Sequence, residues 1–136
     1  MNKAVHTADS FHLEIDGISS GSFLSCSGLA ARVGVFEFAE GGFEGPRKVR
    51  GDLLYSNILL GRGVVREHDL YGWFMKGDLR DGAVILLSRE GKEVARWSFL
   101  RGWPCRWEGP ALDARRSEVA LELLEIAHEG LLCVQR

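Results

Sequence analysis

The stretch that determines the fold runs from Val94 to Ala114 and reads VARWSFLRGWPCRWEGPALDA. It contains three of the four tryptophans of the chain and two of its three prolines. Glycine and proline inside a strand mark bends, and a Gly-Pro pair marks a turn. The stretch therefore predicts a strand that enters a core, bends at Gly102 and Pro104, and leaves through a turn at Gly109-Pro110.

The tryptophans of this stretch are Trp97, Trp103 and Trp107. Aromatic rings at these positions could form a stacking platform for a sugar or a base. They are interleaved with apolar residues and prolines, which favours a place in the core or in a contact between subunits.

A second run, SEVALELLEIAHEG, follows from Ser117 to Gly130. It predicts the last strand of the chain, from Ser117 to Ala127, which pairs with the tryptophan-rich strand. Apolar residues occupy both of its faces, so we expect a central position in the sheet. Glu118 and Glu122 share a face and could form a carboxylate pair. We favour the other interpretation, in which they are charges on an interface or a lumen.

The rest of the chain predicts a mainly β protein, because apolar and polar residues alternate over short runs and 17 glycines punctuate them. A loop without periodicity is expected at 41–52, and a hairpin loop at 89–92. The other strands are predicted at 11–15, 21–27, 30–40, 53–60, 83–88 and 93–103, with Asp81-Gly82 as a turn and 1–10 as an N-terminal arm.

One helix is expected, from Glu67 to Lys76. Leu70, Trp73 and Phe74 form an apolar stripe at helical spacing, and Gly77 suits a left-handed C-cap. A helix this short is not stable alone, so its stripe must pack on the sheet.

The composition predicts one domain over residues 1–136, with 46% apolar and 26% charged residues. A net charge of −2 argues against nucleic-acid binding through a basic surface. The chain has no apolar run long enough to span a membrane and no signal peptide pattern, so we expect synthesis in the cytoplasm and no membrane insertion. The three cysteines match no zinc pattern, and we expect reduced, buried thiols.

Patterns of known catalytic and cofactor sites are missing. There is no nucleophile elbow, phosphate-binding loop or dinucleotide-binding fingerprint. His12 and Glu14 share a strand face, but a surface pair explains them as well as a metal or acid/base site. We therefore expect no enzyme, no cofactor and no metal.

Seven segments, in order, resemble the tail-tube protein family of contractile phages and of phage-derived contractile injection systems. They cover about 11–131. The C-terminal pieces read R-W-x-F, G-W-P-x-R-W-x-G-P-x-L-D-A and S-E-V-A-x-E-x-L-E-x-A-H-E-G. The upstream pieces are FHLEIDG (11–17), SGL (27–29), FEFAEGG (36–42) and YSNILLGRG (55–63). Two positions depart from the family pattern. Arg50-Gly51 stands where relatives often have Pro-Gly, and Gly61 stands where a charged residue is common before Arg-Gly.

The resemblance implies a small antiparallel β-barrel or sandwich with one flanking helix, six copies of which form a ring. Rings stack into the inner tube of a phage tail or injection system, which a contracting sheath drives through a target envelope. The implied partners are other copies of the chain, the sheath protein, baseplate or hub and tube-terminating proteins, and a cargo protein or DNA in the lumen. Assembly is expected in the bacterial cytoplasm, and the product is a phage tail or a released extracellular particle.

The resemblance also suggests which residues meet other copies. The 41–52 loop should reach an adjacent subunit or ring, since its glycines allow an extended shape and its basic residues can meet acids on the neighbour. The expected contact residues are Gly41, Gly42, Arg47, Lys48 and Arg50. The expected lumen-facing residues are Arg32, Glu37, Arg89 and Lys92.

Other functions stay open at this point. The chain could form a specialised ring that initiates the tube beside the baseplate, or the related tube of type VI secretion. In a different class, it could be a small ligand-binding β-barrel or an enzyme with an aromatic pocket, which predicts a stable monomer.

Overall fold

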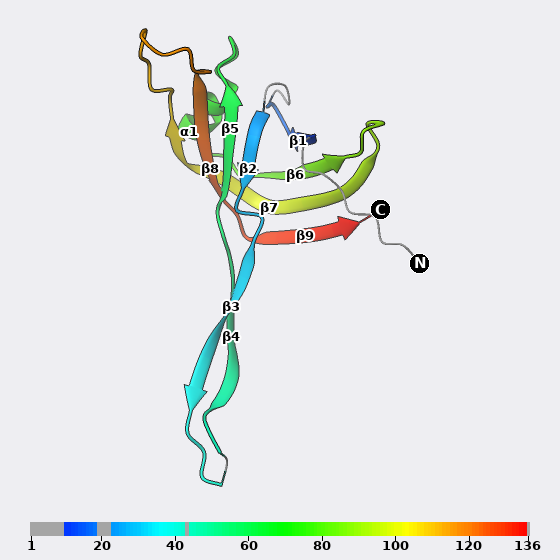
Figure 1. Cartoon of the computed structure of the whole chain (residues 1–136), viewed down its shortest axis with the longest axis vertical. Coiled ribbons are helices and arrows are strands. Elements are labelled where there is room, and N and C mark those ends of the chain that lie inside the picture. The colour runs from blue at the N-terminus through cyan, green and yellow to red at the C-terminus, as the bar shows by residue number, and fades with distance from the viewer. Residues whose placement is uncertain (1–9, 19–22, 43, 136) are drawn as a thin grey trace.

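The computed structural model describes residues 10–18, 23–42 and 44–135, so all but one residue of the predicted N-terminal arm lies outside it. The described part is mainly antiparallel β-structure with one helix, which confirms the predicted fold class (Figure 1). The elements are β1 (Phe11–Ile15), β2 (Phe23–Ser27), β3 (Ala31–Phe38), β4 (Arg47–Tyr55), β5 (Ile58–Gly63), α1 (Asp69–Lys76), β6 (Arg80–Leu87), β7 (Glu93–Glu108), β8 (Leu121–Ala127) and β9 (Gly130–Gln135).

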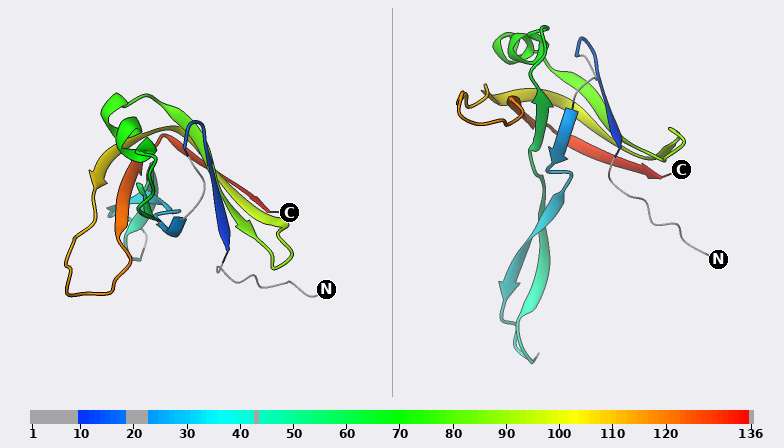
Figure 2. Two further views of the ribbon diagram at one scale, coloured as in Figure 1. Left: turned by 90° about the horizontal axis from the view of Figure 1, so that it is seen from above. Right: turned by 45° about the horizontal axis from the view of Figure 1, so that its top comes forward.

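Seven strands form one curved sheet, and β3 and β4 form a separate hairpin. The order in the sheet is β1-β6-β7-β8-β5-β2, and β9 adds to β7 beside β8. Figure 2 shows the curvature of this sheet from two further directions. The barrel is not closed within the described residues, because β1 and β2 stand at opposite ends of the strand order.

Strand β7 carries the predicted bend and joins the two halves of the sheet. Residues 93–102 pair with β6, and β9 lies along their other side, whereas residues 103–108 pair with β8. Arg101 has a positive φ of 52° at the bend, and the register shifts again between Pro104 and Arg106. Gly102 is required here, because a side chain would collide with the ring of Phe99. The bend predicted at Gly102 and Pro104 is therefore confirmed.

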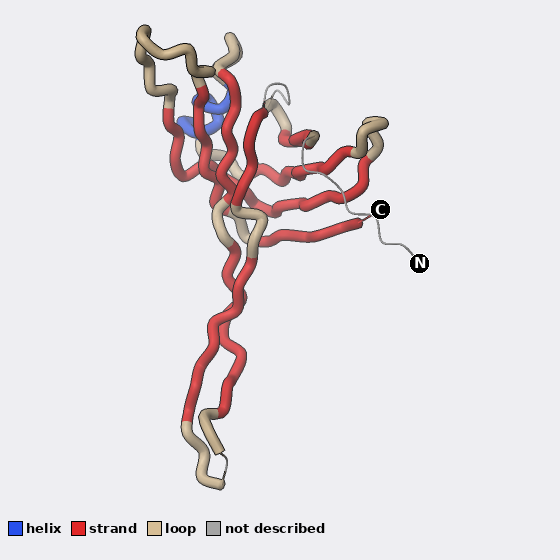
Figure 3. Tube along the Cα trace, in the orientation of Figure 1, coloured by secondary structure: helices blue, strands red, loops and turns tan. Residues whose placement is uncertain are grey.

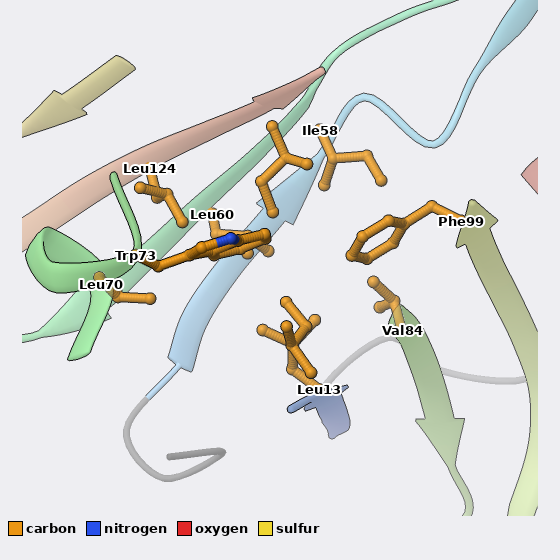
Figure 4. Close-up of a cluster of buried hydrophobic side chains, with 10 residues drawn as sticks. Leu13, Ile58, Leu60, Leu70, Trp73, Val84, Phe99 and Leu124 are labelled. Atoms are coloured by element: carbon orange, nitrogen blue, oxygen red, sulfur yellow. The ribbon is translucent and has the colours of Figure 1, made fainter. Parts of the chain in front are cut away.

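The hydrophobic core lies between the two halves of the sheet and helix α1 (Figure 4). Trp73 and Leu70 of α1 are 1% and 0% exposed, so the predicted apolar stripe does pack on the sheet. The tryptophans of β7 contribute less than expected: Trp97 and Trp107 are half-buried and Trp103 is 41% exposed. A core position for Trp103 is therefore wrong for the single subunit. The core residues are Leu13, Ile15, Ile58, Leu60, Leu70, Trp73, Val84, Phe99, Leu124 and Ile126.

Helix α1 begins two residues later than predicted and ends where predicted. His68 stands at its N-cap without a side-chain cap bond, and the carboxylate of Asp69 is fixed instead by Arg62. Gly77 has φ 70° and ψ 17°, and its N–H donates to the Trp73 carbonyl, which is the predicted left-handed C-cap.

Several predicted strand ends are wrong, because glycines that were interpreted as turns lie inside strands. The predicted strand 53–60 is two strands, and β5 continues through Gly61, which leaves room for the Ser25 side chain. Asp81-Gly82 lies inside β6, where Gly82 makes room for Phe99. The last strand is not β8 but β9, which the sequence analysis missed because only two residues separate it from β8.

Candidate assembly surfaces

The β3–β4 hairpin projects from the body of the molecule along its longest axis (Figures 1 and 3). Its two strands pair only with each other, and they continue the neighbouring strands β2 and β5 beyond the sheet. The loop predicted at 41–52 is wrong from Arg47 onward, because β4 already begins there. Strand pairing explains this: Val49 lies opposite Phe36, and Lys48 lies 3.9 Å from the carboxylate of Glu37.

The base of the projecting hairpin is fixed by a compact set of backbone contacts. Gly28 has a φ of 89°, and its carbonyl accepts from the Ala30 N–H at 2.8 Å. The Ser56 N–H donates to the Ala30 carbonyl at 3.0 Å, which joins the two strands across the junction. His128 adds a third element, since its two ring nitrogens lie 3.0 Å from the carbonyl oxygens of Ser56 and Gly130. The direction of the hairpin is therefore set by the body.

Gly28→Ala is expected to destabilise the subunit more than Gly42→Ala. Both glycines have a positive φ, of 89° and 94°, so each alanine carries a conformational penalty of about 1–3 kcal/mol. An added Cβ at Gly28 would also overlap the Asn57 carbonyl oxygen, whereas nothing lies within 4 Å of one at Gly42. Urea unfolding of both variants measures the difference, and equal losses would show that the junction can yield.

The outer half of the projecting hairpin has two different faces. Residues directly opposite each other in an antiparallel pair point to the same side. Phe36 and Val49 are such a pair, and Phe38 follows on the same side; we call these three residues the apolar face. They are 64%, 45% and 46% exposed in the subunit. The other side carries Glu37, Lys48 and Arg50, together with Val35, which is 64% exposed, so the second face is mainly charged.

The structure does not gather the predicted contact residues on one surface. Gly41 and Gly42 lie in the exposed tip, and Arg47 lies 3.6 Å from Glu40 on the side of the apolar face. Lys48 and Arg50 lie on the charged face. All five are exposed in the subunit, and a contact role for them stays a prediction.

The predicted lumen residues fall in two separate places. Arg32 and Glu37 lie on opposite sides of β3, because they are five positions apart and side chains alternate along a strand. Arg89 and Lys92 lie at the turn between β6 and β7, far from the projecting hairpin (Figure 1). A lumen role for these four residues stays a prediction, but they do not form one continuous surface within a single subunit.

A polar cluster that the sequence analysis did not single out lies on the surface of β5, β7 and β8. Asn57 donates to a carboxylate oxygen of Glu125 at 2.8 Å, and Arg106 donates to the other at 3.1 Å. These hydrogen bonds lower the pKa of Glu125, that from Asn57 first. Arg106 also lies 2.9 Å from Glu108. The outer surface of this part of the sheet is therefore polar and carries both signs of charge.

A buried ion pair holds helix α1 against the sheet. Arg62 lies in β5, in the segment that resembles Y-x-N-I-x-L-x-R-G, and its side chain is 0% exposed. It donates to Glu122 at 2.9 Å and to Asp69 at 3.2 Å, and Trp107 donates to the second oxygen of Glu122 at 3.1 Å. Burial alone would lower the pKa of Arg62, but these hydrogen bonds outweigh it and raise the pKa. Glu122 therefore belongs to this network and not to a pair with Glu118.

No group of three or more histidine, cysteine or acidic side chains in the described residues could hold a metal ion. The helix that the structure describes lacks the length and apolar character of a membrane span. The thiols differ from the prediction, since Cys26 is only half-buried while Cys105 and Cys133 are exposed. The burial of Cys26 raises the pKa of its thiol to about 11. An open hollow of about 720 Å³ beside β1, β6 and β7 has a mixed lining, with charged residues such as Asp81 and Arg96 and apolar residues that include Phe99.

Comparison with known proteins places the chain among tube proteins. The family described as T4-like virus tail tube protein gp19 matches residues 7–132. A search among curated proteins found no match. A chain of the PVC sheath–tube complex, an extracellular contractile injection system, is 19% identical, with 97% of this chain and 93% of that chain covered and a TM-score of 0.87.

Two further solved structures share the fold. A chain of the anti-feeding prophage tube-terminating cap is 20% identical over 100% of this chain and 95% of that chain, with a TM-score of 0.89. Hcp1 from Flavobacterium johnsoniae is 14% identical over 93% of this chain and 95% of that chain, with a TM-score of 0.65.

Proposed function

The chain belongs to the T4-like virus tail tube protein gp19 family, and from that membership we propose that six copies of it form a ring and that rings stack into a tube. It is a tube protein of the kind found in contractile injection systems and phage tails. The observation that carries the proposal is the projecting hairpin, a two-stranded ribbon whose apolar face is 45–64% exposed in the described part of one subunit.

Exposed apolar surface of this kind marks a contact with another protein. Phe36 and Phe38 each carry a large ring. Complete burial of such a ring stabilises a contact by about 1.5–3 kcal/mol. The side with Glu37, Lys48 and Arg50 remains suited to water, to a charged neighbour or to a lumen. The hairpin is therefore the element through which one subunit binds another.

Free strand edges supply a second contact. In the described part of the chain, β2 and residues 103–108 of β7 each pair with a strand on one side only. An unpaired edge is a template for a strand of a neighbouring molecule, and a closed ring of copies uses up such edges. Edge-to-edge contact between β2 of one copy and β7 of the next would make the four strands β7-β8-β5-β2 part of a continuous wall around the lumen.

The proposed role is mechanical. Sheath contraction drives the assembled tube through a target envelope, and the lumen carries cargo protein or DNA. Sheath, baseplate and tube-terminating proteins are the other partners, and assembly takes place in the bacterial cytoplasm before the tail or particle is complete. Catalysis plays no part, since the family is one of structural tube proteins.

Negative-stain electron microscopy of the purified protein, with its mass in solution, is expected to show rings with a central hole or tubes built from them. A monomer at every concentration, with no rings after baseplate components are added, would contradict a tube and support a ligand-binding β-barrel. Rings without tubes would retain the proposed ring and show that stacking needs another component.

A further inference from the structure

His128 lies in the two-residue turn between β8 and β9 and contacts two separate segments of the backbone. Its Nδ1 lies 3.0 Å from the carbonyl oxygen of Gly130, in the same turn. Its Nε2 lies 3.0 Å from the carbonyl oxygen of Ser56, which belongs to the connection between β4 and β5 and is 72 positions away. The ring therefore links the base of the projecting hairpin to the start of β9, where Figure 1 shows the two segments meeting.

The two carbonyl groups set a chemical requirement on the ring. A carbonyl oxygen only accepts hydrogen bonds, so each ring nitrogen must carry a hydrogen for its contact to be a hydrogen bond. Neutral imidazole has one N–H, and its other nitrogen presents a lone pair. One of the two carbonyl oxygens would then face that lone pair at 3.0 Å, which is repulsive. The geometry is therefore that of the imidazolium, which donates from both nitrogens.

The half-buried ring of His128 is bordered by aromatic side chains. The ring centroids of Tyr55 and Phe99 lie 5.5 and 6.2 Å from the centroid of the imidazole. These neighbours belong to β4 and β7, so the ring sits between the hairpin and the body of the subunit. Packing on both sides keeps the imidazole in the position from which it reaches the two carbonyl groups.

The ionised side chains near these contacts have partners of their own. Glu129, the next residue in the turn, forms an ion pair with Arg101 of β7. Glu125 of β8 accepts from Asn57 at 2.8 Å and from Arg106 at 3.1 Å. The carboxylates are thus held by other groups, and the hydrogen bonds of the imidazole go to the backbone. The titratable and charged side chains of the surrounding elements are Tyr55, Arg101, Arg106, Glu125 and Glu129.

We propose that His128 makes the base of the projecting hairpin sensitive to pH: the imidazolium fixes the hairpin to the body, and loss of its proton widens the range of directions that the hairpin takes. The neutral ring keeps one hydrogen bond. Gly130 lies in the same turn and stays close, whereas Ser56 belongs to a separate segment that can move away. A mobile hairpin costs more entropy to dock, so assembly weakens as the pH rises; this consequence rests on the proposed function.

The sign of the effect follows from which form of the ring makes the contacts. Both hydrogen bonds form only in the folded subunit and only with the imidazolium, so the stability that they add is present at low pH and is lost as the pH rises. Histidine ordinarily titrates near pH 6.5, so a comparison of about pH 5.5 with about pH 8 covers the change. Hydrogen bonds to charged groups are strong, and loss of this one should lower the ratio of folded to unfolded subunit about tenfold.

A pair of spin labels measures the direction of the hairpin in the isolated subunit, at a concentration below that of assembly. One label is attached at Glu44→Cys in the exposed tip, and the other at Leu132→Cys on β9, which is 55% exposed. The background carries Cys26→Ala, Cys105→Ser and Cys133→Ser, which removes the natural thiols. The distribution of distances between the labels is expected to be narrow at the lower pH and wider at the higher pH.

Two variants show which histidine is responsible. His128→Gln does not titrate and offers one amide donor group and one acceptor oxygen, as neutral imidazole does. It is expected to give a wide distribution at both pH values, and urea unfolding should show that it lacks the tenfold loss of stability. His68→Gln is the matched control, because His68 is exposed and makes no side-chain cap bond. It should keep the response of the natural protein.

Two outcomes would overturn this role of His128. A distance distribution of one width at both pH values, with His128 in place, would show that the proton does not hold the hairpin; this measurement decides even if His128→Gln fails to fold. A response that persists in His128→Gln would assign it to another group. Neither measurement needs rings or tubes, whose presence in micrographs tests the proposed function separately.

Discussion

Arg62→Leu is expected to destabilise the subunit by about 3–5 kcal/mol, because removal of one partner leaves buried charges without compensation. Arg62 is 0% exposed, and the carboxylates of Asp69 and Glu122 are only 13% and 10% exposed. Without the guanidinium, two negative groups would face each other between α1 and the sheet. Either they take up protons or water enters, and both outcomes loosen the attachment of the helix.

The chain offers a matched control in Arg106→Leu. Arg106 also contacts two carboxylates, those of Glu108 and Glu125, at 2.9 and 3.1 Å. Its side chain is 48% exposed, and exposed ion pairs contribute about 0–1 kcal/mol. Urea unfolding of both variants, in a background that does not assemble, measures the two losses. A loss for Arg62→Leu as small as that for Arg106→Leu would show that the buried network adds no stability.

A triple variant separates charge from packing at Arg62. Asp69→Asn and Glu122→Gln remove both negative charges from the Arg62→Leu protein. If unpaired charge causes the loss, the triple variant should recover part of the stability. If it unfolds as easily as Arg62→Leu alone, the loss comes from the packing of the long side chain.

The sequence predicted the class of fold and its main bend, because both depend on local patterns. Gly102 and Pro104 interrupt a strand that carries large aromatic residues, and glycine and proline inside a strand mark a bend. The stripe of Leu70 and Trp73 likewise needs nothing but helical spacing. The ordered segments that resemble tube proteins then added the family, which the match over residues 7–132 shows.

Strand ends and the identity of buried charges depend on contacts between distant segments, and these could not be predicted. Gly61 and Gly82 were predicted to end strands or to form turns, yet each lies inside a strand. The side chain of Ser25 fills the space beside Gly61, and the ring of Phe99 fills the space beside Gly82. Arg62 has the look of a surface charge until Asp69 and Glu122 are brought beside it. Trp103 illustrates the converse: its apolar ring is 41% exposed in the subunit.

The two faces of the hairpin explain why a loop was expected where a strand is found. Gly41, Gly42 and Gly45 with Pro46 suggest irregular chain, and the basic residues that follow show no apolar period. Pairing with β3 gives them one: Val49 faces Phe36 while Lys48 and Arg50 face the other side. An amphipathic ribbon of this kind is visible only when both strands are considered together.

Phe36→Ser together with Phe38→Ser is expected to weaken tube formation strongly while the subunit stays folded. The two rings are 64% and 46% exposed, so their loss should leave the melting curve of the monomer nearly unchanged. Burial of each ring against a neighbour is worth about 1.5 kcal/mol or more, so the loss of two should raise the concentration needed for assembly about a hundredfold. Sedimentation and electron microscopy over a concentration series measure this shift.

Leu132→Ser together with Val134→Ser is the matched control for that experiment. These two residues lie two apart on one strand, as Phe36 and Phe38 do, and they are 55% and 43% exposed. If apolar surface in general drives association, both double variants should lose tubes to the same degree. If the contact is made by the projecting hairpin, only the phenylalanine variant should lose its tubes. Tubes of normal length from Phe36→Ser/Phe38→Ser would refute the role of the apolar face, because they would show that assembly proceeds without the two phenylalanine rings.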